Sequence, residues 1–114
     1  MDSTLLHICP RPDWVQAQAA GAYLPLSLRE EGFIHLSTPA QIAGTARLFF
    51  EGQSNLVLLL IATEAIAKDL RWENTTGGED LFPHLYAPLP LEAVLKVQDF
   101  APGHDGRWQI EMPG

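Results

Sequence analysis

The sequence predicts a single compact domain of the α+β class, and three observations lead to this prediction. A length of 114 residues leaves room for one hydrophobic core but not for two. Hydrophobic residues make up 46 % of the chain and charged residues 18 %, which is typical of globular domains and not of disordered or fibrous chains. Short apolar segments recur along the whole sequence, whereas the two longer helical patterns lie in its first half. We therefore expect several strands and two helices.

The chain starts with an expected strand and an expected helix. Residues 5–9 form a short apolar run that ends at a proline, which is typical of a buried strand. A helix is expected over 11–20, since Pro12 suits the first helical turn and Gly21 suits the left-handed position after the last one. Residues 22–32 mix proline, charges and isolated leucines, which predicts an irregular connection across the surface.

The second helix has the clearest local signal in the sequence. Thr38 suits the N-cap, Pro39 suits the first helical position, and Gln41 suits the third position of a capping box. We expect a helix over 39–50 that ends near Gly52. Its apolar stripe would consist of Ile42, Ala46, Phe49 and Phe50.

The second half of the chain should be rich in strands. Residues 56–61 are all apolar, which predicts a central strand covered on both faces. A turn of helix over 63–66, a strand over 70–73 and a loop over 74–80 should follow.

Three further extended segments are expected near the end of the chain. Residues 82–86 predict a strand, and Pro83, which has no N–H to donate, predicts that this strand is either an edge strand or an irregular one. After a rigid crossing over 88–91, we expect a strand over 93–97 and one more short strand over 108–112. In the strand over 93–97 the inward-facing side chains would be Val94 and Val97, and Phe100, just after this strand, would also face inward.

Charge and cysteine content limit the partners of the chain. Seven Lys and Arg residues stand against fourteen Asp and Glu residues, and the net charge of −7 argues against a nucleic-acid polymer, although not against a single nucleotide. The single cysteine, Cys9, permits no intramolecular disulfide, which suits a cytoplasmic protein. The first residues do not resemble a signal peptide, and the longest apolar run, 56–62, is too short to cross a bilayer, so we expect no membrane partner. No feature defines an oligomeric state.

Three histidines lie on predicted strands. A lone histidine on a strand is more often a hydrogen-bonded structural residue than a catalytic one. A cysteine, a serine and a tyrosine follow the three histidines within two residues, which predicts a shared cleft lined from several strand ends. In that cleft His35 and His84 should approach each other. Alternation along a strand over 33–37 would place His35 on the same face as Phe33 and Ser37. The three histidines are His7, His35 and His84.

Glu73 is the candidate carboxylate. It follows Trp72 at the end of a predicted strand and precedes a glycine-rich loop. A carboxyl group beside a large aromatic ring has a perturbed pKa or a cationic partner. Arg71 is one candidate partner, although strand alternation separates it from Trp72. The ordinary alternative is a surface carboxylate.

Metal and thiol chemistry are less well supported. The three histidines and Glu73 are acceptable zinc or iron ligands, but no two of them have the close spacing of a compact metal motif, so we assign no metal-binding residue. A dyad of Cys9 with a histidine is an alternative, yet a thiol in a buried strand before a proline is more often inert. The sequence contains no glycine-rich dinucleotide motif, no Walker loop and no nucleophile elbow.

Five segments occur in an order that is specific to one family. They include Gly-Phe-Ile-His at 32–35 and Phe-Pro-His-Leu-Tyr at 82–86, and the full set is 6–8, 31–38, 70–73, 81–86 and 88–91. Together they closely resemble a bacterial family known as domain of unknown function 952, over almost the whole chain. Three positions depart from the pattern: Leu6, Leu36 and Ala87 stand where the family more often has Tyr, Cys and Gly.

The resemblance implies the fold of the ADP-ribosyltransferase-like group, which is a split, strongly bent, antiparallel-rich sheet that binds NAD between its two halves. It also implies roles for particular residues. A first-strand histidine that holds a ribose hydroxyl is matched by His7, and a second-strand segment against the nicotinamide is matched by 33–38. A late-strand glutamate stabilises the sugar cation; Glu73 has this chemistry, and Glu92 is the competing carboxylate. The NAD pyrophosphate usually requires arginine or a helix N-terminus, and the available donors are Arg11, Arg29, Arg47 and the helix that begins at Pro39.

We therefore expect a protein that binds a small molecule or a nucleotide. The first hypothesis is an ADP-ribosyltransferase-like enzyme or enzyme remnant, with NAD as substrate and no separate cofactor. The second is a non-catalytic binding module, and a metal-dependent hydrolase is a further alternative. The expected catalytic residues are Glu73, His35 and His84. The expected ligand-binding residues are His7, Ser37, Thr38 and Tyr86.

Overall fold

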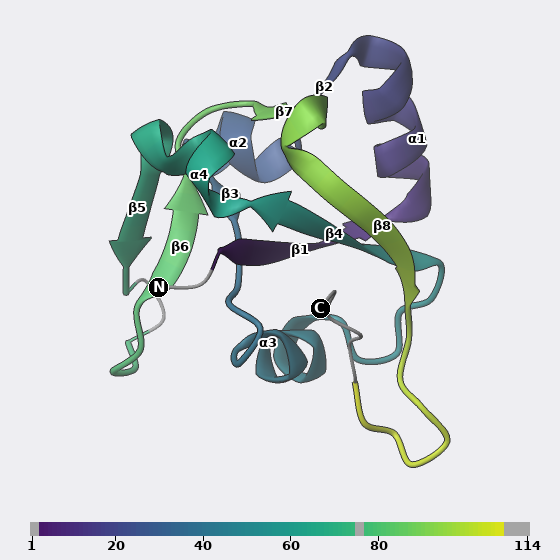
Figure 1. Ribbon diagram of the computed structural model, residues 1–114. Coiled ribbons are helices and arrows are strands. Elements are labelled where there is room, and N and C mark those ends of the chain that lie inside the picture. Colours follow the sequence, from purple (N-terminus) through teal and green to yellow (C-terminus); the bar gives the residue numbers. More distant parts are fainter. Residues whose placement is uncertain (1–2, 75–76, 109–114) are drawn as a thin grey trace.

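Three antiparallel sheets organise the chain in the computed structural model, which describes residues 3–74 and 77–108 (Figure 1). The hydrophobic core is built on the first sheet, which contains β1 (Thr4–Pro10), β4 (Leu56–Ala62) and β8 (Val94–Phe100) in the order β1-β4-β8. The α+β class and the strands expected over 5–9 and 56–61 are confirmed.

The central strand β4 is apolar throughout because hydrophobic clusters cover both of its faces. Its odd-numbered residues belong to a cluster that includes Trp14 and Ala17, and its even-numbered residues belong to another that includes Ile42 and Ala46. Residues 56–61 are all buried. A strand between two clusters has no solvent-facing side, and it therefore loses the polar alternation of a half-exposed strand.

The second sheet contains β6 (Phe82–Leu85) between β3 (Ile34–His35) and β5 (Leu70–Glu73). The prediction that Pro83 confines β6 to an edge strand or an irregular strand was wrong, because β6 pairs with a strand on each side. The N–H and C=O of one residue in an antiparallel strand point to the same side, and the Pro83 carbonyl accepts a 3.0 Å bond from the Leu36 N–H. The Pro83 nitrogen, which carries no N–H, therefore lies on the side of β3, where regular pairing ends at His35. For this reason the pairing with β5 loses no hydrogen bond.

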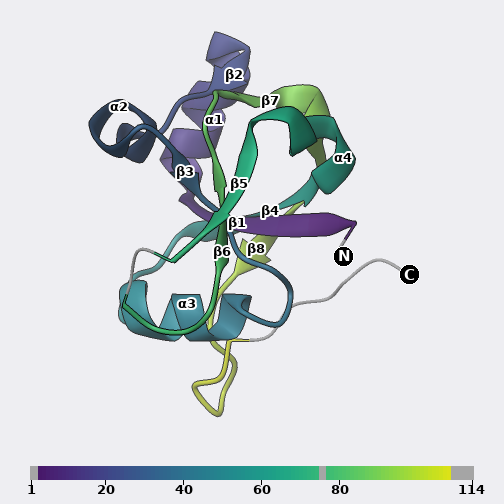
Figure 2. The ribbon, with the colours of Figure 1, turned by 90° about the vertical axis from the view of Figure 1, so that its left-hand side faces the viewer.

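Backbone pairing joins these two sheets. Leu6 of β1 and Ser37, two residues after β3, exchange two N–H···O bonds of 2.8 Å each. The strand expected over 33–37 is therefore divided, because its first part pairs with β6 and its end pairs with β1. Figures 1 and 2 show β5 and β6 running across the direction of β1, so that the two sheets meet at an angle.

The helix expected over 11–20 is α1 (Arg11–Ala20), and Gly21 follows it in the left-handed conformation with φ 89°. The next segment, 22–32, was wrongly predicted to be irregular. It contains β2 (Ala22–Tyr23) and α2 (Leu26–Glu31). The physical reason is long-range pairing: β2 pairs with β7 (Leu89–Pro90), so that Tyr23 and Leu89 become buried together.

The capping box predicted for the next helix is present. The Thr38 N–H donates to Gln41 Oε1 at 3.1 Å, and the Gln41 N–H donates to Thr38 Oγ1 at 3.2 Å. Regular helix α3 (Ile42–Phe49) begins after this turn, later than position 39. Ile42 and Ala46 are buried as expected, but Phe49 is exposed, because Phe50 packs against the cluster at this end of the helix.

Most of the later elements agree with the sequence, but the crossing expected over 88–91 contains β7, and two further details differ. The helical turn at 63–66 is α4 (Thr63–Ile66), and 3₁₀ turns follow at Ala67–Asp69 and Leu91–Ala93. Val97 was predicted to face inward but is exposed, because β8 is an edge strand of this sheet and neither hydrophobic cluster includes Val97. Of the strand expected over 108–112, Trp108 makes an isolated bridge to Pro102, and the rest lies outside the described residues. No helix among the described residues combines the length and apolar character required to span a bilayer.

Two threonine-to-valine substitutions should have opposite effects on stability. Thr38→Val removes half of the capping box and should lower the free energy of unfolding by about 1 kcal/mol. Thr63→Val should raise it by about 1 kcal/mol, because Thr63 Oγ1 is buried without a hydrogen-bond partner. Urea denaturation followed by circular dichroism measures both values. Equal effects of the two substitutions would contradict the assigned roles of the two hydroxyl groups.

Candidate functional site

One face of the β3-β6-β5 sheet carries aromatic and ionisable side chains, while the other face packs against the core. The register places His84 of β6 beside both Arg71 of β5 and His35 of β3. Because side chains alternate along a strand, Glu73 shares the face of Arg71. Trp72, which lies between Arg71 and Glu73 in the sequence, packs against the hydrophobic core instead. We call this surface the aromatic–carboxylate face; it consists of Phe33, His35, Arg71, Glu73, His84 and Tyr86.

Glu73 is held on this face by two donors that share one of its oxygens. The Tyr86 hydroxyl donates to Oε1 at 2.5 Å, and His84 Nδ1–H donates to the same oxygen at 3.0 Å. These bonds, the Tyr86 bond first, lower the pKa of Glu73, so that the carboxylate is ionised at neutral pH. The side chain is 34 % exposed, and Oε2 has no hydrogen-bond partner among the described residues. The Glu73 carboxylate is therefore fixed through Oε1, while its second oxygen makes no hydrogen bond within the described residues.

His84 is almost completely covered by its neighbours. Phe33 stacks on its ring with centroids 4.2 Å apart and an interplanar angle of 21°, and the side chain is 2 % exposed. Nδ1 is bound to Glu73, and Nε2 has no hydrogen-bond partner within the described residues. Nε2 is not fully buried, because the one fully buried side-chain polar atom without a partner among those residues is Thr63 Oγ1. Nε2 therefore lies at the small part of the ring that reaches solvent.

His35 forms the exposed rim of the same face. Its ring meets His84 edge-on at 5.3 Å, which confirms the prediction that these two histidines approach each other. Its Nε2–H donates to Glu31 of α2 at 2.7 Å, and about half of each side chain is exposed. Phe33 completes the rim, with its ring 4.8 Å from that of His35 and 5.2 Å from that of Tyr86.

His7 lies behind this face and contacts its backbone. Its Nδ1–H donates to the His35 carbonyl at 2.6 Å, and Nε2 accepts from the Tyr23 hydroxyl at 2.8 Å. Desolvation lowers the pKa of His7 to about 4, so that the ring is neutral at neutral pH and can accept at Nε2. Both ring nitrogens have protein partners, and a ligand hydroxyl would have to replace one of them.

Two other expected ligand-binding residues serve the helix next to the site. Ser37 is buried, and its Oγ lies 3.0 Å from Thr45 Oγ1 of α3. Thr38 forms the capping box. Within the described residues, no hydrogen bond or ring contact joins either side chain to Glu73 or His84. Of the seven expected site residues, the fold brings together His35, Glu73, His84 and Tyr86.

The sequence analysis named Arg71 only as a possible partner of Glu73 and included Phe33 only within the segment 33–38, and it gave Glu31 no role in the site. The Arg71 guanidinium lies 5.0 Å from the centroid of the Tyr86 ring. Its spacing of two from Glu73 on one strand was the available signal, because residues i and i+2 share a face. The stacking of Phe33 on His84 and the hydrogen bond that Glu31 accepts from His35 had no such signal, since both depend on how β3 is placed against β6 and α2.

Other candidates lie away from this face. Glu92 is exposed in the 3₁₀ turn Leu91–Ala93. Cys9 is fully buried, and burial raises the pKa of its thiol to about 11, which opposes nucleophilic chemistry. In the described part of the chain, no group of three or more His, Cys, Asp or Glu side chains is arranged to hold a metal ion. A shallow depression of about 500 Å³ lies between α1 and α2, and one of about 320 Å³ lies beside α3; neither is lined by the aromatic–carboxylate face.

Comparison with known proteins shows the family to which the chain belongs. Residues 8–97 match the family described as "Protein of unknown function (DUF952)". The chain belongs to this family. The crystal structure of protein CC0527 from Caulobacter crescentus is 39 % identical, with a TM-score of 0.83 and 93 % of each chain covered. The solution NMR structure of the same protein is 38 % identical, with a TM-score of 0.80, covering 93 % of this chain and 91 % of that one. No curated protein matches the chain.

In this DUF952 protein, Tyr86→Phe should raise the pKa of Glu73, because the Tyr86 hydroxyl is the strongest of the groups that lower it. Carboxyl ¹³C NMR titration measures this pKa. Tyr23→Phe is the matched control, since its hydroxyl is bonded to His7 and not to Glu73. An unchanged Glu73 titration in the Tyr86 variant would show that this hydroxyl does not hold the carboxylate.

The stability of this DUF952 protein should fall as the pH falls from 6.5 to 4. The pKa of His7, about 4 in the folded chain, lies below its ordinary value of 6.5, so the unfolded chain takes up the proton first. The contribution of the neutral His7 ring to the free energy of unfolding is full above pH 6.5 and should decrease by roughly 2 kcal/mol toward pH 4. This value follows from ~1.4 kcal/mol for each pKa unit, reduced because His7 is partly exposed.

The measurement is the difference in free energy of unfolding between the wild type and His7→Gln across this pH range. The difference should shrink toward acid pH, because the variant lacks the titrating ring. Parallel curves for the two proteins would contradict a neutral, desolvated His7.

Proposed function

We propose that this protein is an ADP-ribosyltransferase-like enzyme that binds NAD or a related nucleotide on the aromatic–carboxylate face and cleaves the bond between nicotinamide and ribose. The observation that carries the proposal is the fixed carboxylate of Glu73, which has both donors on Oε1 and leaves Oε2 without a hydrogen-bond partner among the described residues. The aromatic rings around it supply a surface for a planar base.

The chemistry of the proposed step requires a carboxylate of this kind. When the glycosidic bond breaks, nicotinamide leaves with the bonding electron pair, and the ribose carbon becomes positively charged. An ionised carboxylate that is already oriented stabilises this charge without reorganising in the transition state. An acceptor hydroxyl or water then forms the new bond to the ribose carbon and loses its proton.

His84 and His35 have different parts in this proposal. His84 holds Glu73 through Nδ1, and its outward Nε2 can receive the proton of a small acceptor, as in other carboxylate–histidine pairs. His35 is half exposed at the rim and can donate to or accept from ribose hydroxyls. His7 would act through the backbone of β3, because its own nitrogens bind Tyr23 and His35.

The arrangement of the sheets supports the ADP-ribosyltransferase-like fold as part of the proposal. Two antiparallel three-stranded sheets meet at the Leu6–Ser37 pairing and run across each other, which is consistent with a split and bent sheet. The aromatic–carboxylate face lies on the smaller half, beside this junction.

A non-catalytic binding module is the second candidate, and one observation favours it. His84 is 2 % exposed beneath Phe33, and neither of the two depressions described above reaches Glu73. A shallow aromatic surface of this kind can stack a planar ligand without enclosing it, and transferase chemistry benefits from a site that excludes water. A metal-dependent hydrolase has no comparable support, because the described residues provide no group of three ligands.

Glu73→Gln should reduce nicotinamide release from NAD by roughly 10²–10³-fold, because it keeps the shape of the side chain and removes its charge. Chromatography of the products with water and with added hydroxyl acceptors measures the release. Glu92→Gln, at the exposed competing carboxylate, is the matched control and should keep wild-type activity.

Thermal unfolding with NAD, ADP-ribose and nicotinamide separates the two candidates, because a ligand that binds the native state raises the melting temperature. Stabilisation by NAD without nicotinamide release would favour the binding module. Release that Glu73→Gln leaves unchanged would exclude Glu73 as the catalytic carboxylate.

A further inference from the structure

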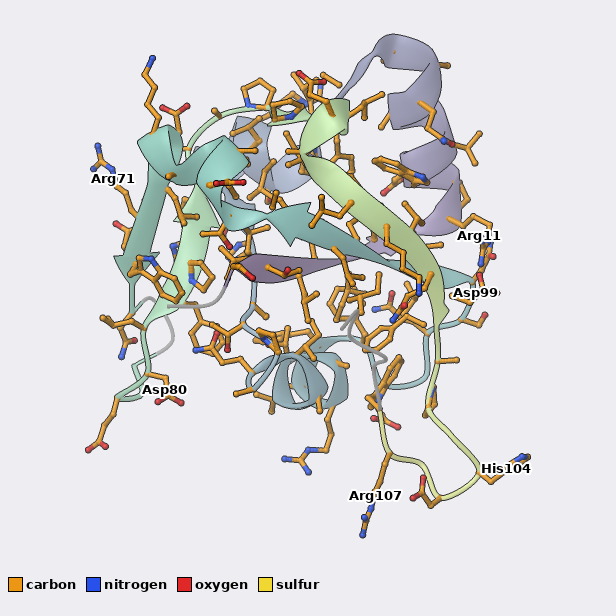
Figure 3. All side chains as sticks on the ribbon, in the orientation of Figure 1. Arg11, Arg71, Asp80, Asp99, His104 and Arg107 are labelled. Carbon is orange, nitrogen blue, oxygen red and sulfur yellow. The ribbon has the colours of Figure 1, made fainter. Side chains whose placement is uncertain are left out.

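Arg71 has an unusual place for a basic residue in this acidic chain. It lies on the aromatic–carboxylate face, its guanidinium 5.0 Å from the centroid of the Tyr86 ring. Arg11 and Arg107 form ion pairs with Asp99 and Asp105, but Arg71 has no carboxylate within ion-pair distance among the described residues. Figure 3 shows Arg71 beside β5, on the opposite side of the molecule from Arg11 and Asp99.

Three groups on this face form a fixed row. The Tyr86 ring supports the Arg71 guanidinium, and the Tyr86 hydroxyl donates to Glu73 at 2.5 Å. Arg71 and Glu73 also share one face of β5 because they are two positions apart. A positive group and a carboxylate thereby lie on the same side of the sheet, and no ion pair joins them among the described residues.

We propose that Arg71 binds a phosphate group of the ligand whose ribose lies against Glu73. This inference rests on the proposed function and assigns to Arg71 the recognition of the phosphate that distinguishes a nucleotide from a nucleoside or a free base. Arginine suits this role because its planar guanidinium binds two phosphate oxygens at once and stacks on an aromatic ring without losing its donors. A face with a carboxylate and no cation would repel the phosphate of such a ligand.

The other arginines considered for this role fit it less well. Arg11 is bonded to both Asn55 and Asp99. Arg29 lines the depression between α1 and α2, and Arg47 lines the one beside α3, and neither depression includes Glu73 or Tyr86. Of these four side chains, Arg71 is the one in contact with the aromatic–carboxylate face.

Calorimetric titration with ADP-ribose and with adenosine tests the inference in the wild type, Arg71→Gln and Arg47→Gln. Arg47→Gln is the matched control, because it changes the net charge by the same amount from an exposed position on α3. We expect Arg71→Gln to weaken ADP-ribose binding by roughly tenfold or more, the usual size of an arginine–phosphate contact. Adenosine binding should stay within twofold of the wild type, and Arg71→Lys should give an intermediate loss.

Equal losses for Arg71→Gln and Arg47→Gln, or no loss for either, would overturn the inference, and so would a wild type that binds adenosine as tightly as ADP-ribose. Nicotinamide release by the wild type and its loss in Glu73→Gln are measured separately, so the proposed function can stand while the role of Arg71 fails. Failure of the wild type to bind either ligand would overturn both. Melting temperatures of the wild type and the three variants verify that each variant is folded.

Discussion

The site depends on the contact between β1 and the segment that contains β3. Leu6 and Ser37 pair through two backbone hydrogen bonds, and one residue further along β1 the His7 ring donates to the His35 carbonyl. These bonds fix the two-residue strand β3, which is too short to hold its own position in a sheet. Because β3 then pairs with β6, the position of His35 beside His84 follows from a contact made in the core sheet.

The β3-β6-β5 sheet keeps core packing and site chemistry apart by strand alternation. Ile34, Trp72 and Leu85 pack on the core side, while their sequence neighbours His35, Glu73 and His84 lie on the aromatic–carboxylate face. Packing on one side therefore makes the opposite side rigid. This explains how Glu73 can be fixed by two donors while its side chain remains partly exposed. The same principle places Arg71 and Tyr86 beside the carboxylate.

Several parts of the fold could be predicted from the sequence because their signals are local. The apolar run of β4, the capping box at Thr38 and Gln41, and the left-handed Gly21 each act within a few residues. The family resemblance rested on motifs that remain together in the chain, and it is confirmed over 8–97. The segment 22–32 and the position of β6 could not be predicted in this way. Their structures depend on pairing with β7 and on the Leu36–Pro83 bond, which join residues far apart in sequence.

For the candidate site, the sequence by itself determined which chemical groups are present and, through alternation, which neighbours on one strand share a face. His35, Glu73, His84 and Tyr86 were predicted as site residues from their types and their places at strand ends. Only the tertiary structure decided which of these groups touch, because β3, β5 and β6 meet through non-local backbone bonds. It also decided that both nitrogens of His7 are occupied and that Ser37 and Thr38 bond to α3 and its N-terminal turn. A hydrogen bond requires two partners within about 3 Å, and for distant residues that distance is set by the fold and not by the spacing in the chain.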